Sequence, residues 1–424
     1  MTSTPCSPPC PGLRRLAPIL LLAALLAACA GPSGVRHDAP LPPASLLLVS
    51  LDGVRPDYLG QGDTPHLDHF ASEGVQAQWM TPSYPALTFP NHYTLVTGLR
   101  PDRHGIVHNR MRDAELGTFS LGNRQAVGDS RWWSGEPIWV GAEKAGLPTA
   151  TLSWPGSEAA IGGVRPTRWF EFDASRSLAE RIDTVANWLT EPATTRPRLA
   201  TLYFEHPDSA GHGHGPDSAE VRQALREVDA ALGELFARLA TAGVLERTNI
   251  VVVSDHGMAA VPADQVISTE SMVDPRHAAL VSAGQVIGFA PRSRFHDEAE
   301  AALLGRHEHY ECWRKAELPA RWHYGSHPRV PPIVCQMDEG WDALPEDFIA
   351  RQPPEDGGSH GYDPALPSMR AIFMARGPAF RRGAVLAAFD NVDVYPLLVR
   401  LLGIEPAAHD GDPATLLPAL RSGD

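Results

Sequence analysis

Short, nearly continuous apolar runs are the feature that most restricts how this chain can fold. They occupy residues 45–51, 199–204, 249–254 and 371–375. Runs of this kind are typical of strands that are covered on both faces, as in a largely parallel sheet. Between them, apolar side chains recur at helical spacing over residues 178–189 and 221–239. The alternation predicts an α/β fold in which helices cover both faces of the sheet.

The composition restricts the class of protein further. Of the 424 residues, 43% are hydrophobic, which is enough for a sizeable core and excludes a largely disordered chain. With 36 basic and 50 acidic residues, the formal net charge is −14. A surface that binds nucleic acid needs clustered Lys and Arg to neutralise the phosphates. We therefore expect no binding of nucleic-acid duplexes, although a local anion site is compatible with this charge.

The first thirty residues have the layout of an export signal. Arg14 and Arg15 precede an apolar run over 16–30, which is shorter than the roughly 20 residues of a membrane-spanning helix. The run contains LAAC, which matches the bacterial lipoprotein box and marks Cys29 for lipidation. We expect a signal peptide over 1–28, a tether over 29–43 and a lipid anchor on Cys29 at the outer membrane, facing the periplasm or the cell surface. The alternative is an ordinary signal peptide cut near Ala30.

Removal of residues 1–28 would leave Cys29, Cys312 and Cys335 as the only cysteines. If Cys29 carries lipid, the other two are an even pair in an oxidising compartment, so we predict a Cys312–Cys335 disulfide. The alternative is two buried free thiols. Both cysteines lie in residues 294–355, which are richer in His, Trp, Arg and Pro. We interpret this stretch as a less regular insertion in one large domain spanning 44–424.

Acidic residues follow three of the four apolar runs. They are Asp52, Asp208 and Asp255. Ligands of open α/β sheets bind beyond the carboxyl ends of the strands, and three carboxylates that meet there repel one another unless a cation neutralises them. Histidines accompany them at His212, four residues after Asp208, at His256, and at His360 in a glycine-rich segment. Asp and His ligands without cysteine suit zinc or another transition metal, and favour a catalytic site over a structural one.

A threonine is the candidate nucleophile. Pro90 suits the first turn of a helix, because its missing N–H costs nothing there. Thr88 would then lie just outside the helix N-terminus, where backbone N–H groups and the helix dipole favour phosphate. A threonine hydroxyl is a poor nucleophile unless a base or metal lowers its pKa, and a metal held by Asp52, Asp255 and His256 would do so. The alternative is that Thr88 only caps the helix.

Over residues 45–400 the chain resembles the nucleotide pyrophosphatase/phosphodiesterase family of the alkaline phosphatase superfamily. Six ordered motifs carry the resemblance: DG at 52–53, TFPNHY at 88–93, TGLRP at 97–101 followed by HGI at 104–106, DSAGH at 208–212, SDHGM at 254–258 and GSHGY at 358–362. The resemblance implies an α/β/α sandwich with a largely parallel central sheet. It also implies two zinc ions (Zn2+), whose ligand sets would be Asp208, His212 and His360 for one, and Asp52, Asp255, His256 and the Thr88 oxygen for the other.

The implied reaction is hydrolysis of nucleotide phosphodiester or pyrophosphate bonds, with release of nucleoside 5′-monophosphates. Thr88 would attack phosphorus and form a covalent phosphothreonine, which water then hydrolyses. Asn109 is similar to the family's asparagine that donates to a phosphate oxygen. Phe89 resembles the aromatic residue on which the base stacks, with Leu121 as a second wall of the pocket and Phe172 as the other aromatic face. For Phe172, the alternative is a core residue near a strand end.

Two other functions compete with this interpretation. The same metal site would serve phosphonates, monoesters or lipid phosphodiesters if the substrate pocket differed. Neutral Asn109 and Phe89 disfavour monoesters, because monoesterases of the superfamily use extra charge to hold the third phosphate oxygen. In the second alternative, the chain is a surface lipoprotein that binds nucleotides without turnover. Replacing Thr88 by alanine separates these, because turnover then collapses only if Thr88 is the nucleophile.

Overall fold

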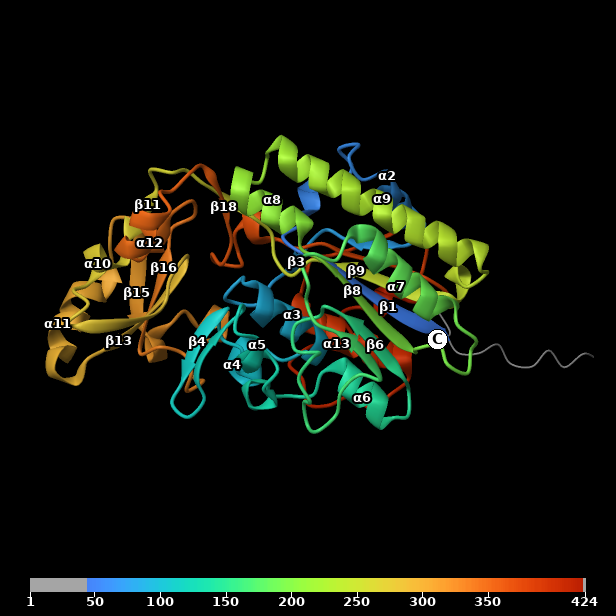
Figure 1. Ribbon diagram of the computed structural model, residues 1–424, viewed down its shortest axis with the longest axis horizontal. Helices are drawn as coiled ribbons and strands as arrows, with labels where there is room; N and C mark the ends of the chain where they lie inside the picture. The colour runs from blue at the N-terminus through green and yellow to red at the C-terminus, as the bar shows by residue number, and fades with distance from the viewer. Residues whose placement is uncertain (1–43, 422–424) are drawn as a thin grey trace, which may run out of the picture. The chain divides into compact units, whose positions relative to one another are not determined.

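One central sheet organises the part of the chain that the structure describes. The computed structural model describes residues 44–421, so the predictions for the signal peptide, the tether and Cys29 lie outside it. Within 44–421, eight strands pair in the order β20–β2–β19–β9–β1–β8–β6–β7 (Figure 1). Their bounds are β1 Ser45–Leu51, β2 Val75–Ala77, β6 Thr149–Leu152, β7 Arg168–Phe170, β8 Leu199–Phe204, β9 Thr248–Val253, β19 Phe373–Arg376 and β20 Ala384–Leu386.

Most neighbouring strands of this sheet run parallel. β1 lies between β8 and β9 and is parallel to both, and β6 is parallel to β7 and β8. Within this sheet, as far as the structure describes it, only β19 runs antiparallel to its neighbours, which are β9 and β2. The predicted strands at 45–51 and 199–204 coincide with β1 and β8, while those at 249–254 and 371–375 are displaced by one and two residues at their starts. The predicted α/β class with a largely parallel sheet is confirmed.

Helices cover both faces of the sheet, because alternate residues of each buried strand point to opposite sides. In β1, Leu47, Val49 and Leu51 belong to one core, whereas Leu46 and Leu48 belong to the other. On the first face lie α2 (Pro65–Ser72), α7 (Leu178–Thr190) and α9 (Ala219–Thr241), and on the second lie α3 (Thr88–Thr97), α6 (Ile138–Lys144) and α13 (Val394–Leu402) (Figure 1). The structure is therefore the predicted α/β/α sandwich.

A second, antiparallel sheet lies in the C-terminal half of the chain. Its strands, in the order β12–β13–β16–β15–β14, are β12 Ala278–Ser282, β13 Val286–Pro291, β14 Gly305–Arg306, β15 Tyr310–Arg314 and β16 Ile333–Met337. Helix α11 (His296–Leu303) packs on one face through Ala299 and Leu303. The predicted disulfide is present, and it joins Cys312 to Cys335 at paired positions of β15 and β16. The sheet begins at residue 278, so the interpreted boundary at 294 falls between two of its strands.

Short elements connect the two sheets and carry parts of the site. Helix α8 (His206–His214) follows β8, β10 (Ala259–Val261) pairs with β18 (Gly357–Ser359), and β4 (Arg110–Asp113) forms a hairpin with β5 (Gly117–Ser120). The other short elements are β3 Met80–Thr81, α4 Pro101–His104, α5 Arg124–Val127, β11 Val266–Ser268, α10 Thr269–Met272, β17 Asp342–Leu344, α12 Glu346–Arg351 and β21 Phe389–Asp390. Among the described helices, none is both long and apolar enough to cross a membrane.

Candidate active site

Three carboxylates meet at the carboxyl ends of three adjacent parallel strands. Asp52 follows β1, Asp208 lies in the first turn of α8 after β8, and Asp255 follows β9. The strand ends are level, since the N–H of Asp52 donates to the carbonyl oxygen of Phe204 at 2.9 Å. Gly53 allows the close approach: its φ is +69°, and a Cβ there would lie 3.2 Å from Asp208 Oδ1. The order of the strands therefore brings the three predicted carboxylates together.

Two histidines form a first group with Asp208. Helix α8 places His212 one turn after Asp208, with its Nε2 3.5 Å from Asp208 Oδ2. His360 directly follows β18, and its Nε2 lies 3.6 Å from Asp208 Oδ1. One ligand atom from each of the three residues lies within 4.8 Å of the others. The structure thus places this predicted ligand set in one cluster.

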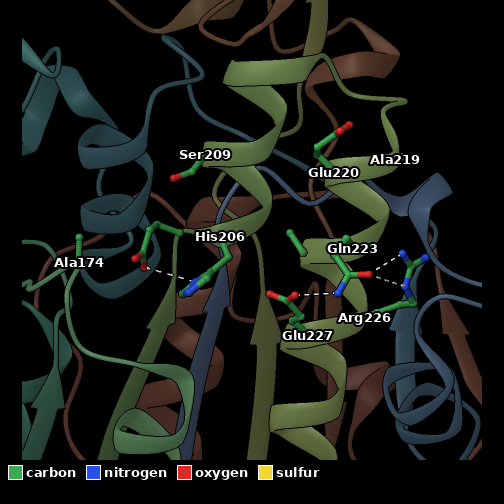
Figure 2. A pocket seen from close by; sticks show the side chains of 10 residues that line it. Ala174, His206, Ser209, Ala219, Glu220, Gln223, Arg226 and Glu227 are labelled. Atoms are coloured by element: carbon green, nitrogen blue, oxygen red, sulfur yellow. Dashed lines mark hydrogen bonds and ion pairs between the residues drawn. The ribbon is translucent and has the colours of Figure 1, made fainter.

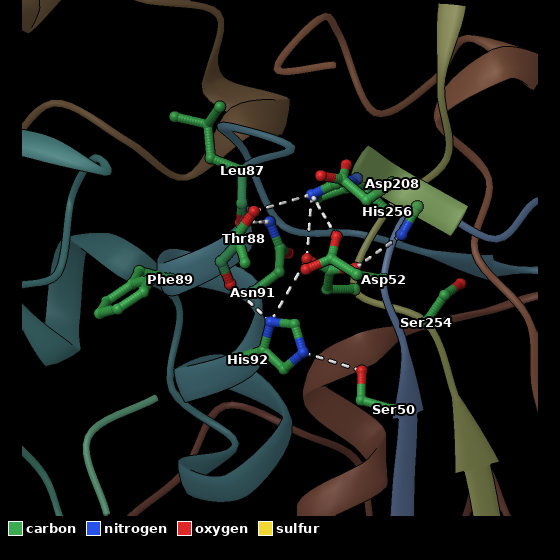
Figure 3. A network of polar contacts seen from close by, with 12 residues as sticks. Ser50, Asp52, Leu87, Thr88, Phe89, Asn91, His92, Asp208, Ser254 and His256 are labelled. Carbon is green, nitrogen blue, oxygen red and sulfur yellow. Dashed lines mark hydrogen bonds and ion pairs between the residues drawn. The ribbon is translucent and has the colours of Figure 1, made fainter. Parts of the chain in front are cut away.

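A second group surrounds His256, just beyond β9. Its Nε2 lies 2.9 Å from Asp255 Oδ2 and 3.6 Å from Asp52 Oδ1. The same nitrogen lies 3.3 Å from Thr88 Oγ1 (Figure 3). The rings of His256 and His360 stack with centroids 3.6 Å apart, so the two groups are in contact. The residues of the second predicted set therefore also lie together.

The predicted ligand histidines are held in one tautomer. The ring Nδ1 of each donates to a backbone carbonyl at 2.9 Å: His212 to Gly358, His256 to Gly257 and His360 to Ala86. A neutral ring that donates through Nδ1 presents a lone pair at Nε2, here toward carboxylate oxygens. One buried oxygen of each of Asp52, Asp208 and Asp255 has no hydrogen-bond partner. Lone pairs that face carboxylates need a cation between them, so the donor set fits a metal ion, and its Asp/His composition suits zinc.

The charges of the site shift the pKa values of its members. Burial, together with Asp255 and Asp208, raises the pKa of Asp52 well above its ordinary value. Burial acts in the same direction on Asp255, but His256 and His92 outweigh it and hold the pKa of that carboxyl well below the ordinary value. Burial and neighbouring histidines lower the pKa of His360 well below its ordinary value, so that its ring is neutral. Without a metal, ionisation of all three carboxylates at neutral pH is therefore unfavourable in free energy.

Thr88 is the first residue of α3. The prediction that it lies just outside the helix is wrong by one position, because Leu87 is the last residue with extended backbone (φ −120°, ψ 154°) and is therefore the N-cap. Pro90 still falls in the first turn. The hydroxyl of Thr88 faces the second group through His256, at the helix end where the helix dipole favours negative charge. The structure thus places the predicted nucleophile in contact with the second group.

His92 was not predicted as a site residue. It lies one turn after Thr88 on α3, and its Nδ1–H donates to the carbonyl oxygen of Thr88 at 2.8 Å. The same nitrogen lies 3.3 Å from Asp255 Oδ2, while the hydroxyl of Ser50 donates to Nε2 at 2.8 Å. The ring therefore ties the start of α3 to the ends of β1 and β9. The available signal was the four-residue spacing from Thr88, together with a polar Ser50 inside an apolar strand.

Tyr203 was also missed. Its hydroxyl donates to Asp52 Oδ2 at 2.5 Å, and its ring packs edge-on against His92 with centroids 5.1 Å apart. The strand LATLYF was interpreted as a continuous apolar run, yet Thr201 and Tyr203 alternate along it and share one face. Two polar side chains on one face of a buried strand was the signal that this face approaches a polar site.

Two of the predicted substrate-binding residues are linked directly. Asn109 Oδ1 accepts a hydrogen bond from the backbone N–H of Phe89 at 3.0 Å, which leaves the amide N–H groups of Asn109 free to donate. The ring of Phe89 points away from the carboxylates (Figure 3) and packs against Phe119 and Trp133 at 5.8 and 6.0 Å.

Leu121 and Phe172 lie apart from each other. Leu121 is 39% exposed and, with Asn109, His212 and His360, lines a hollow of about 400 Å³. This hollow lies beside the first and second groups, which together are called the metal-ligand cluster below. Phe172 is 40% exposed and does not line this hollow; its ring lies 5.9 Å from that of Tyr203. The alternative of a core position for Phe172 is therefore wrong, because more than a third of the side chain is open to solvent.

A larger hollow, of about 670 Å³, lies beside α8 and α9 and contains none of the predicted site residues. It is lined mainly by polar side chains, among them Glu205, Glu220 and Glu227, with Ala174 on a facing loop (Figure 2). Its acidic lining opposes the binding of phosphate. The candidate active site is therefore the smaller hollow, which reaches the histidines.

Comparison with known sequences identifies the relatives of this chain. The profile of the type I phosphodiesterase / nucleotide pyrophosphatase family matches residues 46–363. An uncharacterized pyrophosphatase/phosphodiesterase of Schizosaccharomyces pombe is 36% identical over 392 residues, which cover 89% of this chain and 81% of that protein. The bis(5′-adenosyl)-triphosphatase ENPP4 of Bos taurus is 36% identical over 403 residues, covering 94% of this chain and 85% of that protein.

Solved structures show the same relationship. Murine ectonucleotide pyrophosphatase/phosphodiesterase 5, as an inactive variant in complex with AMP, superposes with a TM-score of 0.84 at 36% identity, covering 89% of this chain and all of that one. The fold, with a cluster of Asp and His at the strand ends, defines a hydrolase of the alkaline phosphatase superfamily. Within that class, the chain belongs to the type I phosphodiesterase / nucleotide pyrophosphatase family, and it is a nucleotide pyrophosphatase/phosphodiesterase enzyme.

Proposed function

We propose that this enzyme uses zinc to hydrolyse nucleotide phosphodiester and pyrophosphate bonds, releases nucleoside 5′-monophosphates, and passes through a phosphothreonine at Thr88. One observation carries the proposal. The Thr88 hydroxyl lies 3.3 Å from His256 Nε2, inside a cluster where buried oxygens of three carboxylates have no hydrogen-bond partner. A nucleophile next to a ready-made cation site is the arrangement that two-metal phosphoryl transfer requires.

Two zinc ions fit the donor set. Asp208, His212 and His360 would hold one ion, and the set of Asp52, Asp255, His256 and the Thr88 oxygen would hold the other. When bound, zinc would supply positive charge that favours the ionised hydroxyl of Thr88 and neutralises the phosphoryl oxygens. The backbone carbonyls that hold each histidine Nδ1–H keep the three rings aimed at these positions.

The chain's own groups account for the remaining parts of the reaction. The dipole at the start of α3 favours the negative phosphoryl group, and the free amide N–H groups of Asn109 are positioned to donate to one of its oxygens. In the first step a bond forms between Thr88 Oγ1 and phosphorus, the bond to the leaving oxygen breaks, and that oxygen receives the proton that Thr88 loses. In the second step the oxygen of water bonds to phosphorus, the bond between phosphorus and Thr88 Oγ1 breaks, and Thr88 Oγ1 receives a proton from that water.

Relatives support a nucleotide as substrate. The murine structural relative was solved with AMP, and its inactive form is a threonine-to-alanine variant. The bovine relative is named as a bis(5′-adenosyl)-triphosphatase. In this chain, the backbone of Phe89 is bonded to Asn109, Leu121 lines the same hollow as Asn109, and the exposed ring of Phe172 offers a further aromatic surface for the nucleoside. Stacking on such rings is the usual way to bind a base.

The test compares turnover of p-nitrophenyl thymidine 5′-monophosphate with that of p-nitrophenyl phosphate, using the zinc-loaded full chain with and without chelator. We expect a strong preference for the diester and loss of turnover with chelator. Replacing Thr88 by alanine should lower turnover of the diester by at least about a thousandfold, while the bound zinc, measured by elemental analysis, persists. Preference for the monoester would overturn the proposed substrate, and unchanged turnover in Thr88→Ala would overturn the nucleophile.

We further propose that the catalytic domain spans 44–424 and is exported as an outer-membrane lipoprotein anchored through Cys29. The LAAC sequence after an apolar run supports this proposal. In cells that express the chain, labelled palmitate should be incorporated into the wild-type protein and should not be incorporated into the Cys29→Ser variant. Equal labelling of both would contradict lipidation at Cys29.

A further inference from the structure

The hollow beside the histidines has a distinctive lining. Leu121, Asn109 and Arg110 line it from the ends of the β4–β5 hairpin, His212 and His360 line it from the metal-ligand cluster, and Gln285, which precedes β13, also lines it. No acidic residue of the described part of the chain lines it. In a chain with 50 acidic and 36 basic residues, a hollow of about 400 Å³ at the active site without a carboxylate in its wall is favourable for an anion.

The position of the hollow matches that of a leaving group. In an in-line displacement the leaving oxygen departs on the side of phosphorus opposite the nucleophile. Thr88 contacts the second group through His256, whereas the hollow opens onto the first group through His212 and His360. A leaving group that departs away from Thr88 therefore passes the first group and enters this hollow.

Arg110 supplies the charge of the hollow. It is the only lysine or arginine in the lining, its side chain is exposed, and within residues 44–421 its guanidinium has no hydrogen-bond or ion-pair partner. It directly follows Asn109, the proposed donor to the transferred phosphoryl group. A guanidinium pairs with phosphate through two parallel hydrogen bonds, so a free one beside the phosphoryl site is suited to the next phosphate along a chain.

The segment that carries Arg110 is fixed to the start of β13 through His108. The backbone N–H of Arg110 donates to His108 Nδ1 at 3.0 Å, and His108 Nε2–H donates to the carbonyl oxygen of Val286 at 3.2 Å. Burial lowers the pKa of His108 to about 4, so this ring is neutral and keeps its bridging tautomer at neutral pH. Val286 follows Gln285, so one buried ring links the segment of Arg110 to the segment of Gln285, and both residues line the hollow.

We infer that this hollow is the subsite for an anionic leaving group and that Arg110 is the residue that selects it. The substrates it favours are nucleotides that release a phosphate-bearing group, such as nucleoside triphosphates, which release pyrophosphate, and dinucleoside polyphosphates. Diesters with an uncharged leaving group gain nothing from Arg110. The inference rests on the proposed function and names the leaving-group class for that same site.

Arg112 provides a matched control for the test. It lies two residues after Arg110 on β4, is also exposed, and does not line the hollow. We would measure kcat/KM for ATP and for p-nitrophenyl thymidine 5′-monophosphate with the zinc-loaded full chain. Arg110→Gln should lower kcat/KM for ATP about tenfold and that for the p-nitrophenyl ester less than about threefold. Arg110→Lys should restore part of the ATP activity, and Arg112→Gln should change the ratio of the two values less than about twofold.

A binding measurement decides the question independently of catalysis. In the Thr88→Ala background, calorimetry on the zinc-loaded full chain should show tighter binding of ATP than of AMP, and Arg110→Gln should reduce that ratio of Kd values about tenfold. The inference would be overturned if Arg110→Gln lowered kcat/KM equally for both substrates, or if Arg112→Gln changed the ratio of the two kcat/KM values as much as Arg110→Gln does. An unchanged ratio of the Kd values for ATP and AMP in Arg110→Gln would also overturn it. If the wild-type protein turns over neither substrate, the proposed function fails, and the Kd ratio still supports or overturns the subsite.

Discussion

At the scale of single residues, the site is organised by groups that surround the metal-ligand cluster. Each predicted ligand histidine is held by a backbone carbonyl, and Tyr203 donates to Asp52 from a buried position. Burial and neighbouring carboxylates raise the pKa of Asp52, so a donor that favours its ionised form has a specific purpose there. Groups that orient ligands in this way contribute to metal affinity although they do not touch the metal.

Replacing Tyr203 by phenylalanine removes the hydroxyl and keeps the ring that packs against Phe172 and His92. We expect the affinity for zinc to fall about tenfold or more, because Asp52 loses the hydrogen bond that stabilises its charge. Competition with a chromophoric chelator measures this affinity. Zinc binding as tight as in the wild-type protein would show that the Tyr203–Asp52 contact has no role in holding the metal.

At the scale of elements, helix α7 holds the end of β8 and the loop next to it. Arg181 is fully buried, and its guanidinium donates to both carboxylate oxygens of Glu205 at 2.5 and 2.8 Å. It also donates to the carbonyl oxygens of Tyr203 and Arg176, at 2.9 and 3.0 Å. The loop that carries Ala174 borders the larger hollow, so no described helix or strand packs against the loop on that side (Figure 2). Arg181 therefore connects this loop to the strand end that carries Tyr203.

Arg181→Gln should lower the free energy of unfolding by about 3 kcal/mol, because it leaves a largely buried Glu205 without its partner. A matched control is Arg168→Gln, which breaks the more exposed ion pair with Glu191 and should cost less than about 1 kcal/mol. Denaturant unfolding of the zinc-loaded proteins measures both values. Similar losses in the two variants would show that the buried pair adds no particular stability.

The buried ring of His108 links the segment before β4 to the start of β13, and we expect acid to weaken this link. Burial lowers its pKa from 6.5 to about 4, so the unfolded chain binds a proton that the folded chain excludes. The stability from His108 is therefore fully present above pH 6.5 and is lost as pH falls toward 4, by about 3 kcal/mol in total. His108→Gln should show a shallower fall in unfolding free energy between pH 7 and 4.5. Equal slopes would contradict a buried neutral ring at this position.

At the scale of the whole catalytic domain, the site joins parts of the chain that are far apart in sequence. The proposed ligands of the first group lie in α8 and after β18, and those of the second lie in α3 and after β1 and β9, so the two metals together would link five segments. A ligand that binds only the folded state adds stability in proportion to the logarithm of its concentration over Kd.

Chelation should therefore lower the melting temperature of the domain. At a free zinc concentration 100 times Kd, bound zinc contributes about 2.7 kcal/mol per site. His212→Ala removes one proposed ligand of the first group and should show a smaller loss of melting temperature on chelation than the wild-type protein. The same loss in both proteins would mean that the first group does not bind the metal.

Much of the fold could be predicted because its signals are local. The continuous apolar run of β1 marks a strand buried on both faces, and the spacing of α9 marks a helix with one apolar side. Likewise, the residues that the structure brings into the site follow strand ends or occupy distinctive motifs. The start of α3 was misplaced by one residue, because the backbone of Leu87 and not the position of Pro90 decides where the helix begins.

The sequence by itself determined which segments are strands and helices and which side chains, such as Asp52 and Thr88, are available for chemistry, because these properties depend on nearby residues. Only the tertiary structure decided that Tyr203 reaches Asp52, that His92 bridges Thr88 to Asp255, and that Arg110 and Gln285 line the same hollow. Those contacts depend on the order and register in which strands pair. That order is set by packing between segments more than a hundred residues apart, on which the local periodicity of the chain carries no information.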